Sequence, residues 1–293
     1  MMNHTAPFSF AAVPRAARSA LQWRLLLLWV LLMLIPTAIL GLTLYNTLSS
    51  QLDYSVHAAE IARQLDATVF SDLMAAHGKN SVAFSGAAIF ALIATLLISP
   101  LLSGMAATAA RAEGTPGFGA LTTGGLAEYP RMLRMLVWSI IPLGVAGALG
   151  GVAMSAAEKY GAKAVLESSA DLASHAALAL SVLLLALMHA SLDAGRAELA
   201  IERRRTSAVK AWWSGCKLLL KRPLATFGVY LLISVAGMGI AALLVAGRIN
   251  VSGASAAGFI GALLLVQLTV AVLGWMRSAR LFAMMELARS QRR

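Results

Sequence analysis

The chain has 293 residues, of which 59% are hydrophobic and only 13% are charged. A soluble globular domain carries about 25% charged residues, so this chain has too few charges to cover a surface that faces water. The same composition excludes intrinsic disorder, and a single cysteine, Cys216, excludes a fold stapled by disulfides. The net charge of +11 would suit nucleic acid, but in a membrane protein the placement of charge matters more than its sum.

Six long windows without Asp, Glu, Lys or Arg divide the chain. A helix needs about 20 apolar residues to cross about 30 Å of hydrocarbon, so each window admits one crossing. The windows lack the alternation of barrel strands, and only helices or closed barrels satisfy their backbone in lipid. The predicted fold is an all-α, polytopic membrane bundle of six transmembrane helices, with residues 1–293 forming a single membrane domain. The windows lie between Arg24 and Asp53, Lys79 and Arg111, Arg134 and Glu158, Asp171 and Asp193, Arg222 and Arg248, and Arg248 and Arg277.

The distribution of Lys and Arg predicts the orientation. The two termini and the loops at 104–134 and 193–222 would lie on one side of the membrane, and these segments hold 19 of the 24 basic residues. By the positive-inside rule that side is cytoplasmic. The expected location is therefore the bacterial inner membrane, with several crossings and both termini in the cytoplasm.

The layout of the helices also suggests three repeated hairpins, at approximately 10–111, 119–196 and 207–280. Each hairpin ends in a small-residue turn that is closed by an arginine: Arg111, Arg196 and Arg280. Each begins with a basic stretch that is expected to lie in the membrane interface. The alternative is that any hairpin membrane protein carries basic residues at its inner ends, without a true repeat.

The stretch 207–222 has the pattern of an interfacial amphipathic helix. Val209, Trp212 and Cys216 fall on one side of it, and the lysines fall on the opposite side. Such a helix would contact anionic lipid headgroups on the cytoplasmic face, or it would only seat the helix that follows. The residues expected at the lipid interface are Lys210, Trp212, Trp213, Lys217 and Lys221.

Two further features concern packing. The outer loop at 46–82 contains an apolar periodicity over 58–73, which predicts a second amphipathic helix that caps the bundle or docks a partner. In the third crossing Gly147 and Gly151 form a GxxxG step, which is expected to let a neighbouring helix approach closely.

One polar face is a candidate functional site. His189, Asp193 and Arg196 lie within two helical turns, where the fourth crossing reaches the cytoplasmic boundary. This face could relay a proton or grip a phosphate. The alternative is a local ion pair in which Asp193 holds Arg196, and also Arg111 or Arg280 from the other hairpins.

No sequence motif indicates catalysis. No set of His, Cys, Asp and Glu has metal-ligand spacing, and the sequence contains no Walker loop and no GxSxG motif. We expect no metal, no cofactor and no enzymatic activity.

Several short segments resemble bacterial six-helix integral membrane proteins of unassigned function, similar to the membrane domain fused to some glycerophosphodiester phosphodiesterases. The resemblance implies an α-helical bundle in an inner membrane and supplies no activity. The segments are Leu102–Met105, Asp193–Ala197, Glu202–Ser207, Lys210–Gly215 and Lys221–Pro223.

Three functions are open at this stage. The first is a non-enzymatic accessory subunit, scaffold or assembly factor that acts with a protein partner of unknown identity. The second is a transporter or lipid-handling permease, which the glycine-rich spans and the apparent repeat would suit. The third is an intramembrane enzyme that uses His189, Asp193 and Arg196. Membrane lipids, anionic on the cytoplasmic face, are expected partners in each case, and nucleic acid is not.

Overall fold

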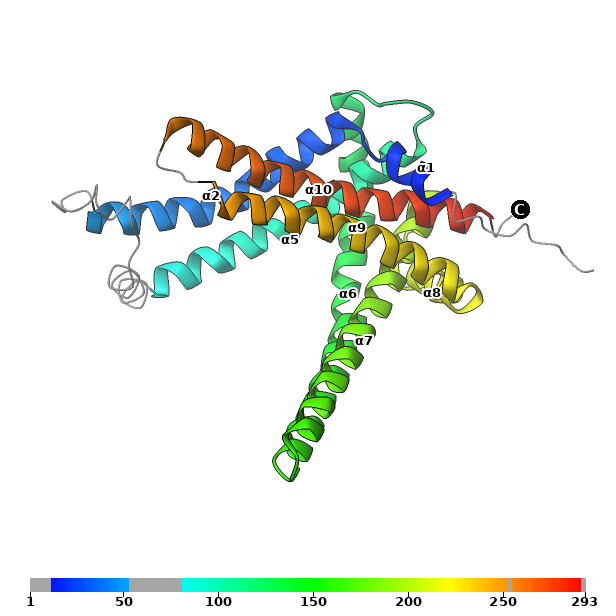
Figure 1. Ribbon diagram of the computed structural model, residues 1–293. Helices are drawn as coiled ribbons and strands as arrows, with labels where there is room; N and C mark the ends of the chain where they lie inside the picture. The colour runs from blue at the N-terminus through cyan, green and yellow to red at the C-terminus, as the bar shows by residue number, and fades with distance from the viewer. Residues whose placement is uncertain (1–11, 53–80, 252–254, 291–293) are drawn as a thin grey trace, which may run out of the picture. The chain divides into compact units, whose positions relative to one another are not determined.

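The computed structural model describes residues 12–52, 81–251 and 255–290, and every regular element in these ranges is an α-helix (Figure 1). The predicted all-α class is confirmed. The helix expected over 58–73 lies outside the described residues.

Six of the helices are long and apolar enough to cross a membrane. Their positions match the six windows of the sequence, so the chain is a multi-pass integral membrane protein. They are α2 (Trp23–Leu52), α5 (Ser81–Arg111), α6 (Phe118–Gly161), α7 (Glu167–Ile201), α9 (Pro223–Ile249) and α10 (Ala256–Ser290).

Two shorter helices, α1 (Ala12–Ser19) and α8 (Ala208–Lys221), precede α2 and α9. Helix α8 ends at Lys221, the backbone of the following Arg222 is not helical, and Pro223 begins α9. A residue before proline disfavours the helical conformation, while proline itself suits the first position of a helix, so this break follows from the sequence. The second interfacial stretch differs, because 119–134 is continuous with its span in the single helix α6.

The chain divides into two compact units. Unit 1 comprises residues 1–22, 103–235 and 276–293, which include α1, α6, α7, α8 and the ends of three other helices. Unit 2 comprises residues 23–102 and 236–275. All the polar groups discussed below belong to unit 1.

In unit 2 a close approach joins the first and last crossings. A Cβ added at Gly274 on α10 would lie 2.7 Å from the ring of Trp29 on α2. Trp29 and Leu25 are both buried. Glycine at position 274 therefore leaves the space in which the indole ring lies.

Within unit 1, α6 and α7 pack against each other as an antiparallel pair (Figure 1). Their seam is made of small residues: Ala146, Gly150 and Ala157 on α6 and Ala177 on α7 are buried. Ser181 of α7 donates a hydrogen bond to the carbonyl of Gly150 at 3.3 Å. The outward faces of both helices carry large exposed apolar side chains, as suits contact with lipid.

The GxxxG step does not mediate this contact. A Cβ added at Gly147 or Gly151 would meet no atom within 4 Å, whereas one at Gly150 would lie 2.9 Å from the Ser181 hydroxyl. The expectation from the sequence was therefore wrong by one position. The spacing of small residues was read correctly, but the face that meets α7 is the one that carries Ala146 and Gly150.

Helix α8 crosses the end of α7 at very short range. A Cβ added at Gly215 would lie 2.6 Å from the backbone of both Ser191 and Gly195, and one at Gly195 would lie 2.9 Å from the Cα of Trp212. The buried face of α8 is a stripe of mostly small residues. This stripe contains Ala208, Ala211, Gly215 and Leu218.

Candidate functional site: two arginine clusters at the helix ends

The Asp193 cluster comprises His189, Asp193, Arg196, Arg277 and Arg280. Asp193 is buried in α7, and its two carboxylate oxygens face different partners. Nη1 of Arg196 donates to Oδ1 at 2.6 Å, while Nε of Arg280 from α10 lies 3.1 Å from Oδ2. Nδ1 of His189 lies 3.6 Å from the same Oδ2. One carboxylate thus joins α7 to α10.

Arg280 is buried and is held from several sides. Its Nη1 donates to the hydroxyl of Ser234 on α9 at 3.0 Å, and its guanidinium lies 5.0 Å from the centre of the Tyr230 ring. The ring of His189 also lies beside Tyr230, with 5.7 Å between the ring centres. Arg280 therefore connects three helices through an ion pair, a hydrogen bond and a cation–π contact.

Arg277 stands one helical turn before Arg280, and its side chain is exposed. No carboxylate of the described residues lies within ion-pair distance of it. Protein atoms pack around much of its guanidinium group, and its charged neighbours are Arg196, Asp193 and Arg280. Arg277 therefore adds positive charge to a cluster in which the nearest carboxylate already has two arginine partners.

The Glu128 cluster comprises Arg111, Glu128, Arg131 and Arg203. Glu128 is 2% exposed on α6. Nη2 of Arg111, the last residue of α5, donates to Oε1 of Glu128 at 2.9 Å, and Nη1 of Arg131 donates to Oε2. Nε of Arg203 lies 3.9 Å from Oε1. The ends of α5 and α7 are thereby tied to α6.

The remaining donors of this second cluster cap the C-terminus of α7. Nη2 of Arg131 donates to the carbonyls of Leu199, Glu202 and Arg205 at 2.5, 2.7 and 3.0 Å. Nη1 of Arg111 donates to the carbonyl of Ala200 at 2.9 Å. The last carbonyls of a helix have no partner within it and carry partial negative charge, so cations at this end stabilise it. The guanidinium groups of Arg111 and Arg131 are consequently committed to protein acceptors.

The structure brings together some of the residues that the sequence singled out. His189, Asp193 and Arg196 meet on α7, and Arg280 joins them. Arg111 does not, because it pairs with Glu128 instead. Glu128 and Arg131 were not singled out from the sequence, although they stand three residues apart on α6, a spacing that could have marked them as a pair. Arg277 could have been found as the first charge after an apolar run.

The basic residues of α8 face outward. Lys210, Trp213, Lys217 and Lys221 are exposed. Trp212 is turned toward the protein, where its Nε1 donates to the hydroxyl of Ser191 at 3.0 Å and its ring lies 5.6 Å from that of Trp138. Burial raises the pKa of the Cys216 thiol on this helix above its ordinary value.

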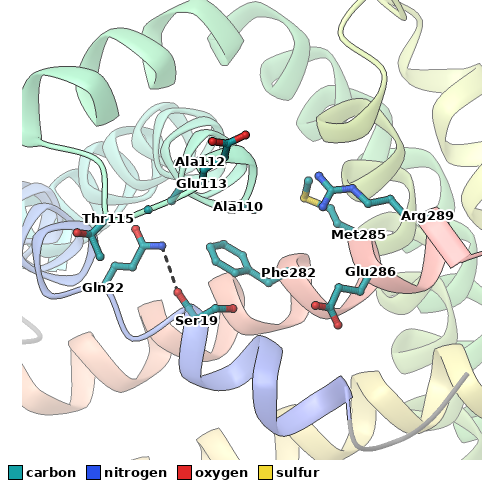
Figure 2. A pocket seen from close by; sticks show the side chains of 12 residues that line it. Ser19, Gln22, Ala110, Ala112, Glu113, Thr115, Phe282, Met285, Glu286 and Arg289 are labelled. Carbon is teal, nitrogen blue, oxygen red and sulfur yellow. Dashed lines mark hydrogen bonds between the residues drawn. The ribbon is translucent and has the colours of Figure 1, made fainter.

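A cavity of about 300 Å³ lies at the ends of α1, α5 and α10 (Figure 2). Glu113 and Thr115 from the segment after α5, Glu286 from α10 and Gln22 line it, and Nε2 of Gln22 donates to the carbonyl of Ser19 at 3.2 Å. None of the residues of the two arginine clusters lines this cavity. Its volume is at the lower end of the range for small-molecule sites.

Among the residues that the structure describes, no group of three or more His, Cys, Asp and Glu side chains could hold a metal ion. No family model, curated protein or solved structure matches this chain. The resemblance to six-helix membrane proteins stays a prediction from the sequence.

Proposed function

We propose that this integral membrane protein is a non-enzymatic accessory subunit, scaffold or assembly factor that acts with a protein partner. The observation that carries the proposal is the use made of buried charge. Glu128 is bound by arginines that also cap α7, and Asp193 is bound by arginines from α7 and α10. Charges used in this way tie helix ends together. They support a fixed platform rather than a reacting centre.

The exposed side of α8 offers this platform a surface for contact. Trp213 is 55% exposed, and three lysines surround it on the same short helix. Tryptophan is enriched in protein interfaces, and a basic surface selects an acidic partner through complementary charge. The buried stripe of α8 is packed against α7 within unit 1, so its outer side is positioned before any partner binds.

Site-specific photocrosslinking tests this proposal. p-Benzoylphenylalanine is placed at Trp213, and in a matched control at Ile140, which is exposed on α6 within a candidate span. We expect ultraviolet light on intact cells to give one discrete protein adduct from position 213 and none from position 140. Adducts with lipid alone at both positions would contradict the accessory role and favour the transporter or lipid-handling permease.

The location is part of the same proposal. The excess of basic residues near the ends of α5, α7 and α10 supports a bacterial inner membrane with both termini in the cytoplasm. A reporter that is active only in the periplasm, fused after Arg293, should give no signal. A strong signal would contradict this orientation without bearing on the partner.

A further inference from the structure

We propose that the Asp193 cluster binds the phosphate group of an anionic membrane lipid, with Arg277 as the residue that is free to engage it. The proposal concerns a lipid site on α7 and α10. It does not depend on a protein partner at α8.

The Asp193 cluster holds more positive than negative charge. Within the described part of the chain, Arg196, Arg277 and Arg280 lie around a single carboxylate, Asp193. Three guanidinium groups against one carboxylate leave two positive charges without a matching negative one, even with His189 neutral. Grouped charges of one sign at the edge of a low-dielectric medium are costly unless an ion of opposite sign joins them. An anion from outside the chain would supply this charge.

The arginines of this cluster differ in how many of their donors the protein already uses. Arg280 is 5% exposed, forms an ion pair with Asp193 and donates a hydrogen bond to Ser234, so it is fixed in place. Arg277 is exposed one turn away on the same face of α10, and it has no carboxylate partner among the described residues. A planar guanidinium with five donors matches the oxygens of a phosphate, which it can bind through two parallel hydrogen bonds. Such binding needs a fixed positive charge, here Arg280, beside a guanidinium group whose donors are unused, here Arg277.

The charge-free length of α10 suits a position of Arg277 at the edge of the hydrocarbon core. The segment of α10 from Ala256 to Met276 carries no charge, and at 1.5 Å per residue it spans about 31 Å. This length matches the hydrocarbon core of a bilayer, which is about 30 Å thick. Arg277 is the next residue, so it reaches the level at which lipid phosphates lie. Basic pockets between transmembrane helices at this level bind anionic headgroups.

The Glu128 cluster shows why the same inference does not apply to every arginine here. Arg111 and Arg131 donate to backbone carbonyls of α7 and its following loop as well as to Glu128. Their donors are occupied, and the negative end of the helix offsets their charge. A lipid phosphate would have to displace these bonds.

Lipid binding to the purified full chain tests the proposal. Native mass spectrometry in detergent would follow titration with phosphatidylglycerol and, separately, with zwitterionic phosphatidylcholine. The variants are Arg277→Gln, Arg277→Lys and a matched control, Lys163→Gln, which removes one exposed positive charge from the turn between α6 and α7. Because Arg277 is exposed and has no ion-pair partner among the described residues, its replacement should leave the fold intact, and intrinsic tryptophan fluorescence checks this.

We expect the wild-type chain to prefer phosphatidylglycerol, and Arg277→Gln to weaken that binding about tenfold, the effect of losing one charge-assisted hydrogen bond. Arg277→Lys should lie between the two, and Lys163→Gln should change the affinity less than about twofold. Equal losses in Arg277→Gln and Lys163→Gln would overturn the proposal, as would the same affinity for both lipids. Displacement of the bound lipid by millimolar inorganic phosphate would overturn the assignment to a lipid.

Discussion

The Glu128 and Asp193 clusters are built from the same parts and differ in how their charge is completed. Each has a buried carboxylate that holds arginines from two helices. Around Glu128 the other guanidinium donors bond to the carbonyls that end α7. Around Asp193 no backbone carbonyl of the described residues accepts from these arginines, and Arg277 stays exposed. The first cluster is closed by the protein itself, and the second is left with unmatched positive charge.

This difference shows that an arginine count does not by itself identify a binding site. A guanidinium group has five donors, and what matters is how many of them the fold has already used. Arg131 has acceptors on all three of its nitrogens. Arg277 has no hydrogen bond with any side chain or carbonyl that the structure describes. Arg277 is therefore the arginine whose donors are available to an acceptor from outside the protein.

The largest effect should follow from opening the closed cluster. Glu128→Gln leaves the buried Arg131 and the half-buried Arg111 without their carboxylate, which should destabilise the protein by about 3–5 kcal/mol. Thermal unfolding in detergent, followed by tryptophan fluorescence, measures the change. Glu286→Gln, which removes an exposed carboxylate from α10, should change stability by less than about 0.5 kcal/mol. Equal effects of the two variants would show that Glu128 does not hold the helix ends.

The next effect concerns the contact between α7 and α8 near Asp193. Close packing holds α7 here, whereas near Glu128 hydrogen bonds from guanidinium groups to carbonyls hold it. Gly215→Ala places a Cβ 2.6 Å from the backbone of α7, which should force α8 away and cost about 1–3 kcal/mol. In the control Gly119→Ala, the new Cβ meets no atom within 4 Å, and the helix gains propensity. The two variants should therefore shift the unfolding temperature in opposite directions. A stable Gly215→Ala variant would contradict the close crossing.

A smaller effect is expected at Tyr230, where two substitutions distinguish the contribution of the ring from that of the hydroxyl. Tyr230→Phe keeps the aromatic face beside Arg280, whereas Tyr230→Leu removes it. We expect Tyr230→Leu to be less stable than Tyr230→Phe by about 0.5–2 kcal/mol, the range for a cation–π contact. Chemical denaturation in mixed micelles would measure the difference. Equal stability of the two variants would mean that the ring does not help to hold Arg280.

The smallest effect concerns Cys216 on α8, which lies outside both clusters. Burial raises the pKa of its thiol, so less thiolate is present at neutral pH and alkylation should be slow. The rate with iodoacetamide should rise with pH further into the alkaline range than for an ordinary thiol. A cysteine introduced at exposed Trp213 in a Cys216→Ser background provides the reference. Matching rates for the two positions at pH 7.5 would contradict the burial of Cys216.

The sequence was sufficient for the six helices, because charge-free windows depend only on the order of residues and on the thickness of a bilayer. It also found Asp193 with Arg196, since their spacing along one helix brings them together without any tertiary contact. Arg280 stood only as one of two alternatives, because the choice between it and Arg111 depends on how three helices pack.

What the sequence could not supply was the face by which a helix packs. Gly150 and not Gly147 meets α7, and the closest approach of α8 to α7 is made at Gly215. Periodicity gives the spacing of a stripe but not its partner. Where helices approach to backbone contact, small residues define the interface, and a scale that weighs large apolar residues does not mark them.

The most direct test of the contrast between the clusters is to remove each carboxylate and then offer a lipid anion. Glu128→Gln and Asp193→Asn would be unfolded thermally in nanodiscs of phosphatidylcholine and in nanodiscs that contain phosphatidylglycerol. We predict that both variants lose stability in phosphatidylcholine, and that the anionic lipid restores Asp193→Asn alone, because only its arginines have donors that a phosphate can reach. Equal restoration of both variants, or of Glu128→Gln alone, would contradict the distinction between a closed and an open cluster.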